Sequence, residues 1–157
     1  MIRLNIILLG KLKENHWREA EAEYLKRLSA FAKVNIVELK EESFTDKDPS
    51  VQTKKKEAER ILAAMSRISD TFFVALEEKG KQYSSTEFSK QLFKWTESRS
   101  VTFIIGGPLG LDSEVVKKVS ASLSLSPLTF THQMARVILL EQVYRAMMIG
   151  QNRKYHY

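Results

Sequence analysis

Short apolar runs that alternate with amphipathic helical segments constrain the fold of this 157-residue chain more than any other feature. Apolar runs of four to eight residues are typical of buried strands, and apolar residues three to four positions apart are typical of helices. The sequence predicts strands at Leu4–Leu9, Val34–Leu39, Thr71–Leu76 and Val101–Ile105. It predicts helices at Glu14–Phe31 and Val51–Met65, from Ser84 through Trp95, from Asp112 to about Ser120, and at Gln133–Gly150. This alternation predicts one α/β domain over residues 1–157, with a mostly parallel sheet covered by helices on both faces.

The residue content excludes several classes of site. The chain has no cysteine, which rules out disulfides, cysteine-based zinc sites, iron–sulfur clusters and thiol nucleophiles. Its three histidines are widely separated and show no metal-ligand spacing, so we expect no metal. No apolar run approaches the roughly 20 residues of a membrane span, and the first residues do not resemble a signal peptide. We therefore expect a cytoplasmic protein that does not enter a membrane.

The positive charge of the chain is unevenly distributed. The net charge is +6, and residues 133–157 contribute half of it, with four cationic residues against Glu141 alone. A mildly basic protein can bind a polyanion such as a nucleic acid without being required to. The alternative interpretation is a solvated, slightly basic C-terminal region.

The predicted strand Val101–Ile105 stops abruptly at a glycine-rich turn that contains Gly106, Gly107 and Gly110. In open α/β sheets, ligands bind beyond the carboxyl ends of the strands, and glycine lets the backbone approach a ligand closely. The spacing G-G-x-x-G is neither the dinucleotide fingerprint nor a P-loop. The turn is therefore a candidate ligand site, and a plain strand-to-helix connection is the alternative.

A second candidate site is the segment Ser122–His132, which contains no charged residue unless His132 is protonated. Backbone N–H and C=O groups in apolar surroundings suit the edge of an adenine better than a phosphate. The alternatives are a buried strand with a flanking loop, and a histidine with a purely structural role.

The last predicted helix and the residues after it form a third candidate. Apolar residues occupy most of the circumference of Gln133–Gly150, which indicates burial on more than one side; the simplest additional partner is a second copy of the chain. The following segment, Asn152–Tyr157, mixes cationic and aromatic residues, which can grip phosphates and stack on bases. A frayed terminus is the alternative.

These three pieces occur together, in this order, in one family. The chain resembles the small SPOUT-class RNA methyltransferases of the RlmH type almost from end to end. The matching stretches are MIRLNIILLGKLKE at the start, Tyr24–Leu28, Leu76–Glu77, Phe103–Leu111, Leu123–Ala146 and the closing YHY.

The resemblance implies a homodimer with a C-terminal trefoil knot that transfers the methyl group of S-adenosylmethionine (S-adenosyl-L-methionine) to N3 of a pseudouridine in 23S ribosomal RNA, on the ribosome. Carried onto this chain, it implies cofactor binding by Leu76, Gly106, Gly107, Gly110, Leu125, Ser126, Pro127, Leu128, Thr129 and Phe130. Pro127 occupies a position that varies in the family and could stiffen the loop.

Methylation at N3 requires that the proton of this nitrogen be lost, so the site needs a proton acceptor or a group that stabilises the anion. His132 could accept the proton and Arg136 could stabilise the anion, and His156 is a rival base that could reach the pocket of a partner subunit. We favour a shared role, in which the tail residues Arg153, Tyr155 and His156 become ordered on RNA and complete the site. The residues expected to contact RNA are Arg136, Arg153, Lys154, Tyr155 and His156.

Three rival functions remain open from the sequence. One is methylation of another RNA, which the small size and the lack of an added RNA-binding domain disfavour. Another is a non-catalytic ribosome-binding or assembly factor on the same fold, which would have no affinity for the cofactor. The third is a generic nucleotide-binding α/β protein, which the missing phosphate motif disfavours.

Overall fold

A five-stranded, fully parallel sheet forms the centre of the protein in the computed structural model, which describes residues 1–43, 45, 47 and 49–155. The strands lie in the order β2-β1-β4-β3-β5. Their bounds are Ile2–Leu9 for β1, Ala32–Leu39 for β2, Thr71–Lys81 for β3, Ser100–Ile105 for β4 and Ala121–Leu123 for β5. All four pairings are parallel, so the carboxyl ends of the strands lie at one edge of the sheet.

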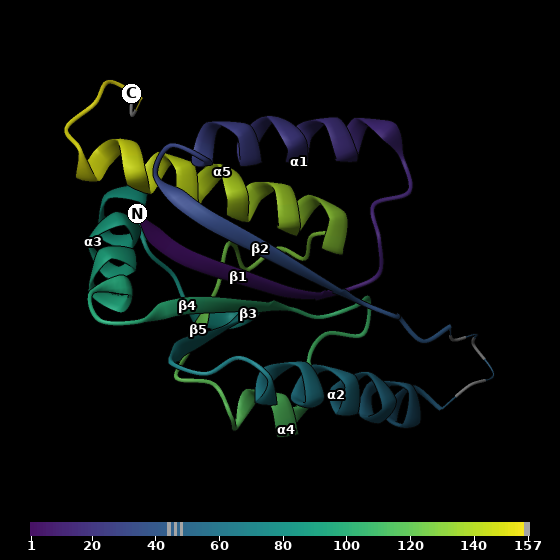
Figure 1. Ribbon diagram of the computed structural model, residues 1–157. Coiled ribbons are helices and arrows are strands. Elements are labelled where there is room, and N and C mark those ends of the chain that lie inside the picture. Colours follow the sequence, from purple (N-terminus) through teal and green to yellow (C-terminus); the bar gives the residue numbers. More distant parts are fainter. Residues whose placement is uncertain (44, 46, 48, 156–157) are drawn as a thin grey trace.

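Helices cover both faces of this sheet (Figure 1). On one face, α1 (Asn15–Leu28), α3 (Ser85–Thr96) and α5 (His132–Gly150) pack around a core that includes Leu4, Ile6 and Leu8 of β1. On the other face, α2 (Ser50–Ser66) and α4 (Ser113–Val116) pack against Ile7 and Leu9. Both faces of β1 are buried, which explains why its sequence is a nearly continuous apolar run rather than an alternating one.

The predicted α/β architecture is confirmed, and the boundaries differ in two informative places. β3 continues to Lys81, five residues beyond the predicted end at Leu76, with a register shift between those residues in its pairing with β5. The helix predicted from Asp112 to about Ser120 is a single turn that ends at Val116, because the chain must reach β5 at Ala121.

A capping box begins α3: the Glu87 N–H donates to the Ser84 hydroxyl, and the Ser84 N–H donates to the Glu87 carboxylate at 2.8 Å. No helix among the described residues is long and apolar enough to cross a membrane. The trefoil knot implied by the resemblance is not tested by the strand order and pairings, and it stays a prediction.

Candidate active site

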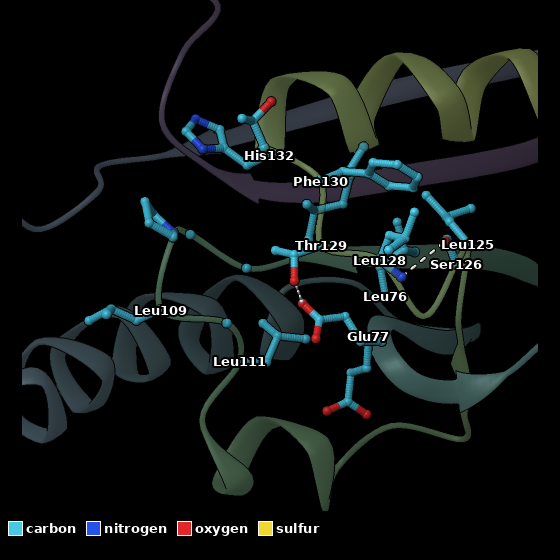
Figure 2. Close-up of a pocket in the computed structure, with 18 of the residues that line it drawn as sticks. Leu76, Glu77, Leu109, Leu111, Leu125, Ser126, Leu128, Thr129, Phe130 and His132 are labelled. Atoms are coloured by element: carbon cyan, nitrogen blue, oxygen red, sulfur yellow. Dashed lines mark hydrogen bonds between the residues drawn. The ribbon is translucent and has the colours of Figure 1, made fainter.

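A cavity of about 740 Å³ opens at the carboxyl edge of the sheet, where open α/β folds place their ligands (Figure 2). Three segments line it: the end of β3 from Leu76 to Lys79, the turn Ile105–Leu111 after β4, and residues between Leu123 and Ala135. These segments are distant in sequence and meet because β3 pairs with both β4 and β5. The volume is typical of sites for small molecules and cofactors.

The structure brings together nine of the ten residues that were predicted to bind the cofactor. The nine that line the cavity are Leu76, Gly106, Gly107, Gly110, Leu125, Ser126, Leu128, Thr129 and Phe130. Pro127 does not line the cavity, although its neighbours on both sides do. Residues that bind one cofactor must line the same cavity, and these nine do; that they bind the cofactor stays a prediction.

The glycine turn forms one wall of the cavity, and its conformation requires glycine at two positions. Gly110 has a φ of +77°, and its N–H donates to the Gly107 carbonyl at 2.9 Å. A Cβ added to Gly106 would lie 2.9 Å from the carbonyl carbon of Gly110, which is too close. A side chain at either position would strain or open the turn, and this explains why the sequence has glycine there.

The segment from Ser124 to Phe130 forms the opposite wall and is held by its own hydroxyl groups. The Ser124 hydroxyl donates to the Ser126 carbonyl at 3.0 Å, and the Ser126 hydroxyl accepts from the Leu128 N–H at 3.0 Å. Thr129 donates through its hydroxyl to Glu78 at 2.7 Å, which ties this loop to the end of β3 (Figure 2). The serine and threonine content of this segment therefore shapes a loop.

Sequence reasoning missed the charged residues of the cavity, which are Glu77, Glu78 and Lys79. Glu77 accepts a hydrogen bond from the Ser122 hydroxyl at 2.8 Å. The predicted strand ended at Leu76, whereas β3 continues to Lys81, which pairs with Leu123 of β5. The cavity thus combines apolar walls with two carboxylates.

His132 lies at the N-terminal end of α5 and lines the cavity, with 17% of its side chain exposed. Its Nε2 is 3.9 Å from a Glu41 carboxylate oxygen. Gly10, with a φ of +84°, leaves the space in which the two groups meet; a Cβ there would lie 2.7 Å from the Glu41 oxygen. His132 is therefore placed where it could exchange a proton with a molecule in the cavity.

Arg136, which was predicted to stabilise the anion and to contact RNA, is not among the residues that line the cavity. Its side chain is buried and bonded by two carboxylates: Glu21 accepts from Nε and Nη2, and Glu38 accepts from Nη1 at 2.9 Å. A guanidinium with these partners joins α5 to α1 and β2. The structure thus favours a stabilising role for Arg136 over the predicted contacts with substrate.

The C-terminal tail, which we define as Arg153–Tyr155, lies at the other end of α5. Tyr155 packs edge-on against Tyr144 at 4.9 Å between ring centroids, and the Arg145 guanidinium lies over the Tyr155 ring. The Arg153 guanidinium lies over Phe31, and Lys154 is exposed. The predicted roles of His156 fall outside the described residues.

The distance between tail and cavity is set by α5. His132 begins this helix and the tail follows its end, and nineteen helical residues span about 28 Å. The structure therefore does not bring the tail residues of a chain to the cavity of the same chain.

Within the described ranges, no group of three or more His, Asp or Glu side chains could hold a metal ion. Chemically, the cavity can enclose the faces of a flat ring between leucine and phenylalanine side chains and offer backbone groups to its edges. Its two carboxylates outnumber the single ammonium group of Lys79, which favours a ligand that carries positive charge.

Comparison with known proteins gives a consistent result over the whole chain. A family model described as "Predicted SPOUT methyltransferase" matches residues 2–156. Proteins named ribosomal RNA large subunit methyltransferase H from Bacillus cereus and Bacillus thuringiensis are 46% identical over 160 residues, which cover 99% of each chain.

Solved structures with similar folds are more distant in sequence. A probable methylase family protein from Haemophilus influenzae superimposes with a TM-score of 0.58 at 13% identity and covers 99% of this chain and 70% of its own. A probable methyltransferase from Bordetella pertussis gives a TM-score of 0.55 at 15% identity, with 93% and 96% coverage. These two likenesses show the fold.

Proposed function

Because the chain belongs to the SPOUT methyltransferase family, we propose that it transfers a methyl group from S-adenosylmethionine to N3 of a pseudouridine in 23S ribosomal RNA. Full-length similarity to relatives named ribosomal RNA large subunit methyltransferase H supports ribosomal RNA as the substrate. The structural observation that carries the proposal is the cavity, in which the glycine turn and the Ser122–His132 segment, two candidates singled out in the sequence, meet the end of β3.

The cavity fits S-adenosylmethionine in size and in chemistry. Leu76, Leu125 and Phe130 can enclose the adenine ring, and the backbone of the two loops can bond to its edges. Glu77 and Glu78 supply negative charge to a ligand with a sulfonium and an ammonium group. When bound, this cofactor would supply an electrophilic methyl group: the N3 lone pair would form a bond to the methyl carbon in line with the breaking C–S bond, whose electrons would leave with sulfur.

The protein must hold the two reactants in line and receive the N3 proton. Positioning of this kind supplies much of the rate in a displacement reaction. His132 is the described cavity residue best suited to accept a proton, and its neighbour Glu41 would stabilise the imidazolium that results. His132→Ala should therefore slow methylation strongly, and near-normal rates in both His132→Ala and His156→Ala variants would exclude a histidine base.

We further propose that the enzyme works as a homodimer in which the tail of one subunit serves the cavity of the other. The separation of tail and cavity along α5 supports this arrangement, since one chain does not bring them together. Exposed apolar side chains near the cavity, Leu128 at 72% and Met134 at 39%, offer a surface for a second copy. Arg153, Lys154, Tyr155 and His156 would then contact RNA beside the partner's cofactor.

The deciding experiment is mass-spectrometric mapping of methylated nucleotides in ribosomal RNA from cells with and without the protein. We expect one methylated pseudouridine to disappear on deletion and to return when purified protein and S-adenosylmethionine are added to ribosomes in vitro. Parallel reactions with free 23S RNA, the large subunit and the joined ribosome would identify the substrate, which we expect to be an assembled particle in the cytoplasm.

The same experiment tests two of the three rival functions. A methyl group lost from transfer RNA, with ribosomal RNA unchanged, would overturn the substrate. An unchanged methylation pattern, together with no calorimetric heat on titration with S-adenosylmethionine, would support a non-catalytic ribosome-binding factor.

A further inference from the structure

Glu57 is a buried carboxyl group that the proposed reaction does not use. It lies on α2, on the face of the sheet opposite α5, and only 4% of the residue is exposed. Its Oε2 atom has no hydrogen-bond partner among the described residues. An acidic side chain buried in this way is costly unless another interaction compensates for it.

Among the described residues, the positive charge of Arg60 lowers the pKa of Glu57 but does not outweigh the effect of burial. Arg60, one turn further along α2, is bonded by the Glu42 carboxylate at 2.5 Å and by the Lys40 carbonyl at 2.9 Å. Glu41 and Glu42 add negative charge nearby. Burial, and secondly the charge of Glu41, raise the pKa of Glu57 above its ordinary value. The neutral carboxyl group, which can both donate and accept a hydrogen bond, is therefore favoured.

The unpaired oxygen of Glu57 lies directly behind the glycine turn. A Cβ added to Gly107 would be 3.0 Å from Oε2 and 3.6 Å from Oε1. Gly107 also lines the cavity, so the turn separates the carboxyl group from any bound ligand by the thickness of one backbone segment. The absence of a side chain at Gly107 is what makes this close approach available.

We propose that Glu57 is a positioning residue for the cofactor: its carboxyl group supports the glycine turn from behind and gains a backbone partner when the turn closes on the bound cofactor. The inference rests on the proposed function, because it assigns this wall of the cavity to S-adenosylmethionine. A polar group that is unpaired in the free protein and paired in the complex makes binding more favourable, since only the complex gains the hydrogen bond.

The test compares Glu57→Leu with Glu57→Gln by calorimetric titration with S-adenosylmethionine and by thermal unfolding. Leucine keeps much of the volume and removes the hydrogen-bonding groups, so we expect the Kd to rise about tenfold, the value of one net hydrogen bond. The unfolding temperature of this variant should stay level or rise, because the cost of burying a carboxyl group with one unpaired oxygen has been removed. Glutamine retains a donor and an acceptor and should preserve cofactor affinity.

Glu59→Gln provides the matched control, since Glu59 is exposed on the same helix, and it should change neither quantity. Wild-type affinity in Glu57→Leu would overturn the inference, as would an affinity loss that follows a loss of thermal stability in both Glu57 variants. If Glu57→Leu does not fold, Gly107→Ala is compared in the wild-type protein and in the Glu57→Ala protein. The added methyl group should weaken cofactor binding less in the Glu57→Ala protein, and equal weakening in both would refute the contact between Glu57 and Gly107. Absence of cofactor binding by the wild-type protein would instead refute the proposed function.

Discussion

Replacement of Arg136 by methionine distinguishes a structural arginine from one that acts on the substrate. The guanidinium is buried and bonded to Glu21 and Glu38, whose side chains are 14% and 34% exposed. Removal of one partner from a buried ion pair typically costs 3–5 kcal/mol, and partial exposure of the two carboxylates favours the lower end, about 3 kcal/mol. For a chain of this size, that loss corresponds to a decrease in Tm of about 6–12 °C.

The assay is thermal unfolding followed by circular dichroism, with methylation measured well below the Tm of the variant. We expect Arg136→Met to lose stability and to keep most of its activity while folded. The triple variant Arg136→Met, Glu21→Gln, Glu38→Gln should recover much of the loss, because no uncompensated charge remains. A wild-type Tm combined with abolished methylation would refute this reasoning and restore the role at the substrate that the sequence predicted.

Three further predictions address the dimer, the buried carboxyl group and the α3 cap. A mixture of inactive His132→Ala and Arg153→Ala proteins, co-refolded, should regain activity, because a mixed dimer contains one intact cavity facing one intact tail; no recovery would contradict a shared site. The stability of Glu57→Gln relative to the wild type should increase as the pH rises. Because the pKa of Glu57 is raised in the folded state, this group stabilises the wild type fully below pH 4.5, and that stabilisation is lost as the pH rises through the folded-state pKa. Urea midpoints that differ equally at pH 4 and pH 8 would argue against this. Ser84→Ala removes the acceptor for the Glu87 N–H and should cost about 1 kcal/mol in urea unfolding, and an unchanged midpoint would show that the cap contributes nothing.

Much of the fold could be predicted because its strongest signals are local. Strands β1 and β4 are short apolar runs, each followed by glycine, and the capping box of α3 is contained in four residues. The end of β3 could not be predicted in this way. Residues 77–81 are polar or glycine, and they continue the strand because of β5, which lies more than 40 residues later in the chain.

The candidate site shows the same division between local and long-range causes. The glycine turn was recognisable because Gly110 has a backbone conformation that favours glycine. Arg136 was assigned to the substrate because its spacing from His132 was known, whereas its partners lie 115 and 98 positions away in the sequence. Glu57 sits in the charged run KKKEAER and looks like any solvated residue until the packing of α2 buries it.

The strand order also determines when during translation this protein can become functional. β1 is made first, yet its neighbour β4 begins about 100 residues later, and α5, with its charge network to Glu21 and Glu38, comes last. Synthesis proceeds at about 5–20 residues per second, so the N-terminal half must remain incompletely paired for seconds. Since Ser124–Ala135 forms part of the cavity wall, a nascent chain cannot assemble the cavity until this segment has left the exit tunnel.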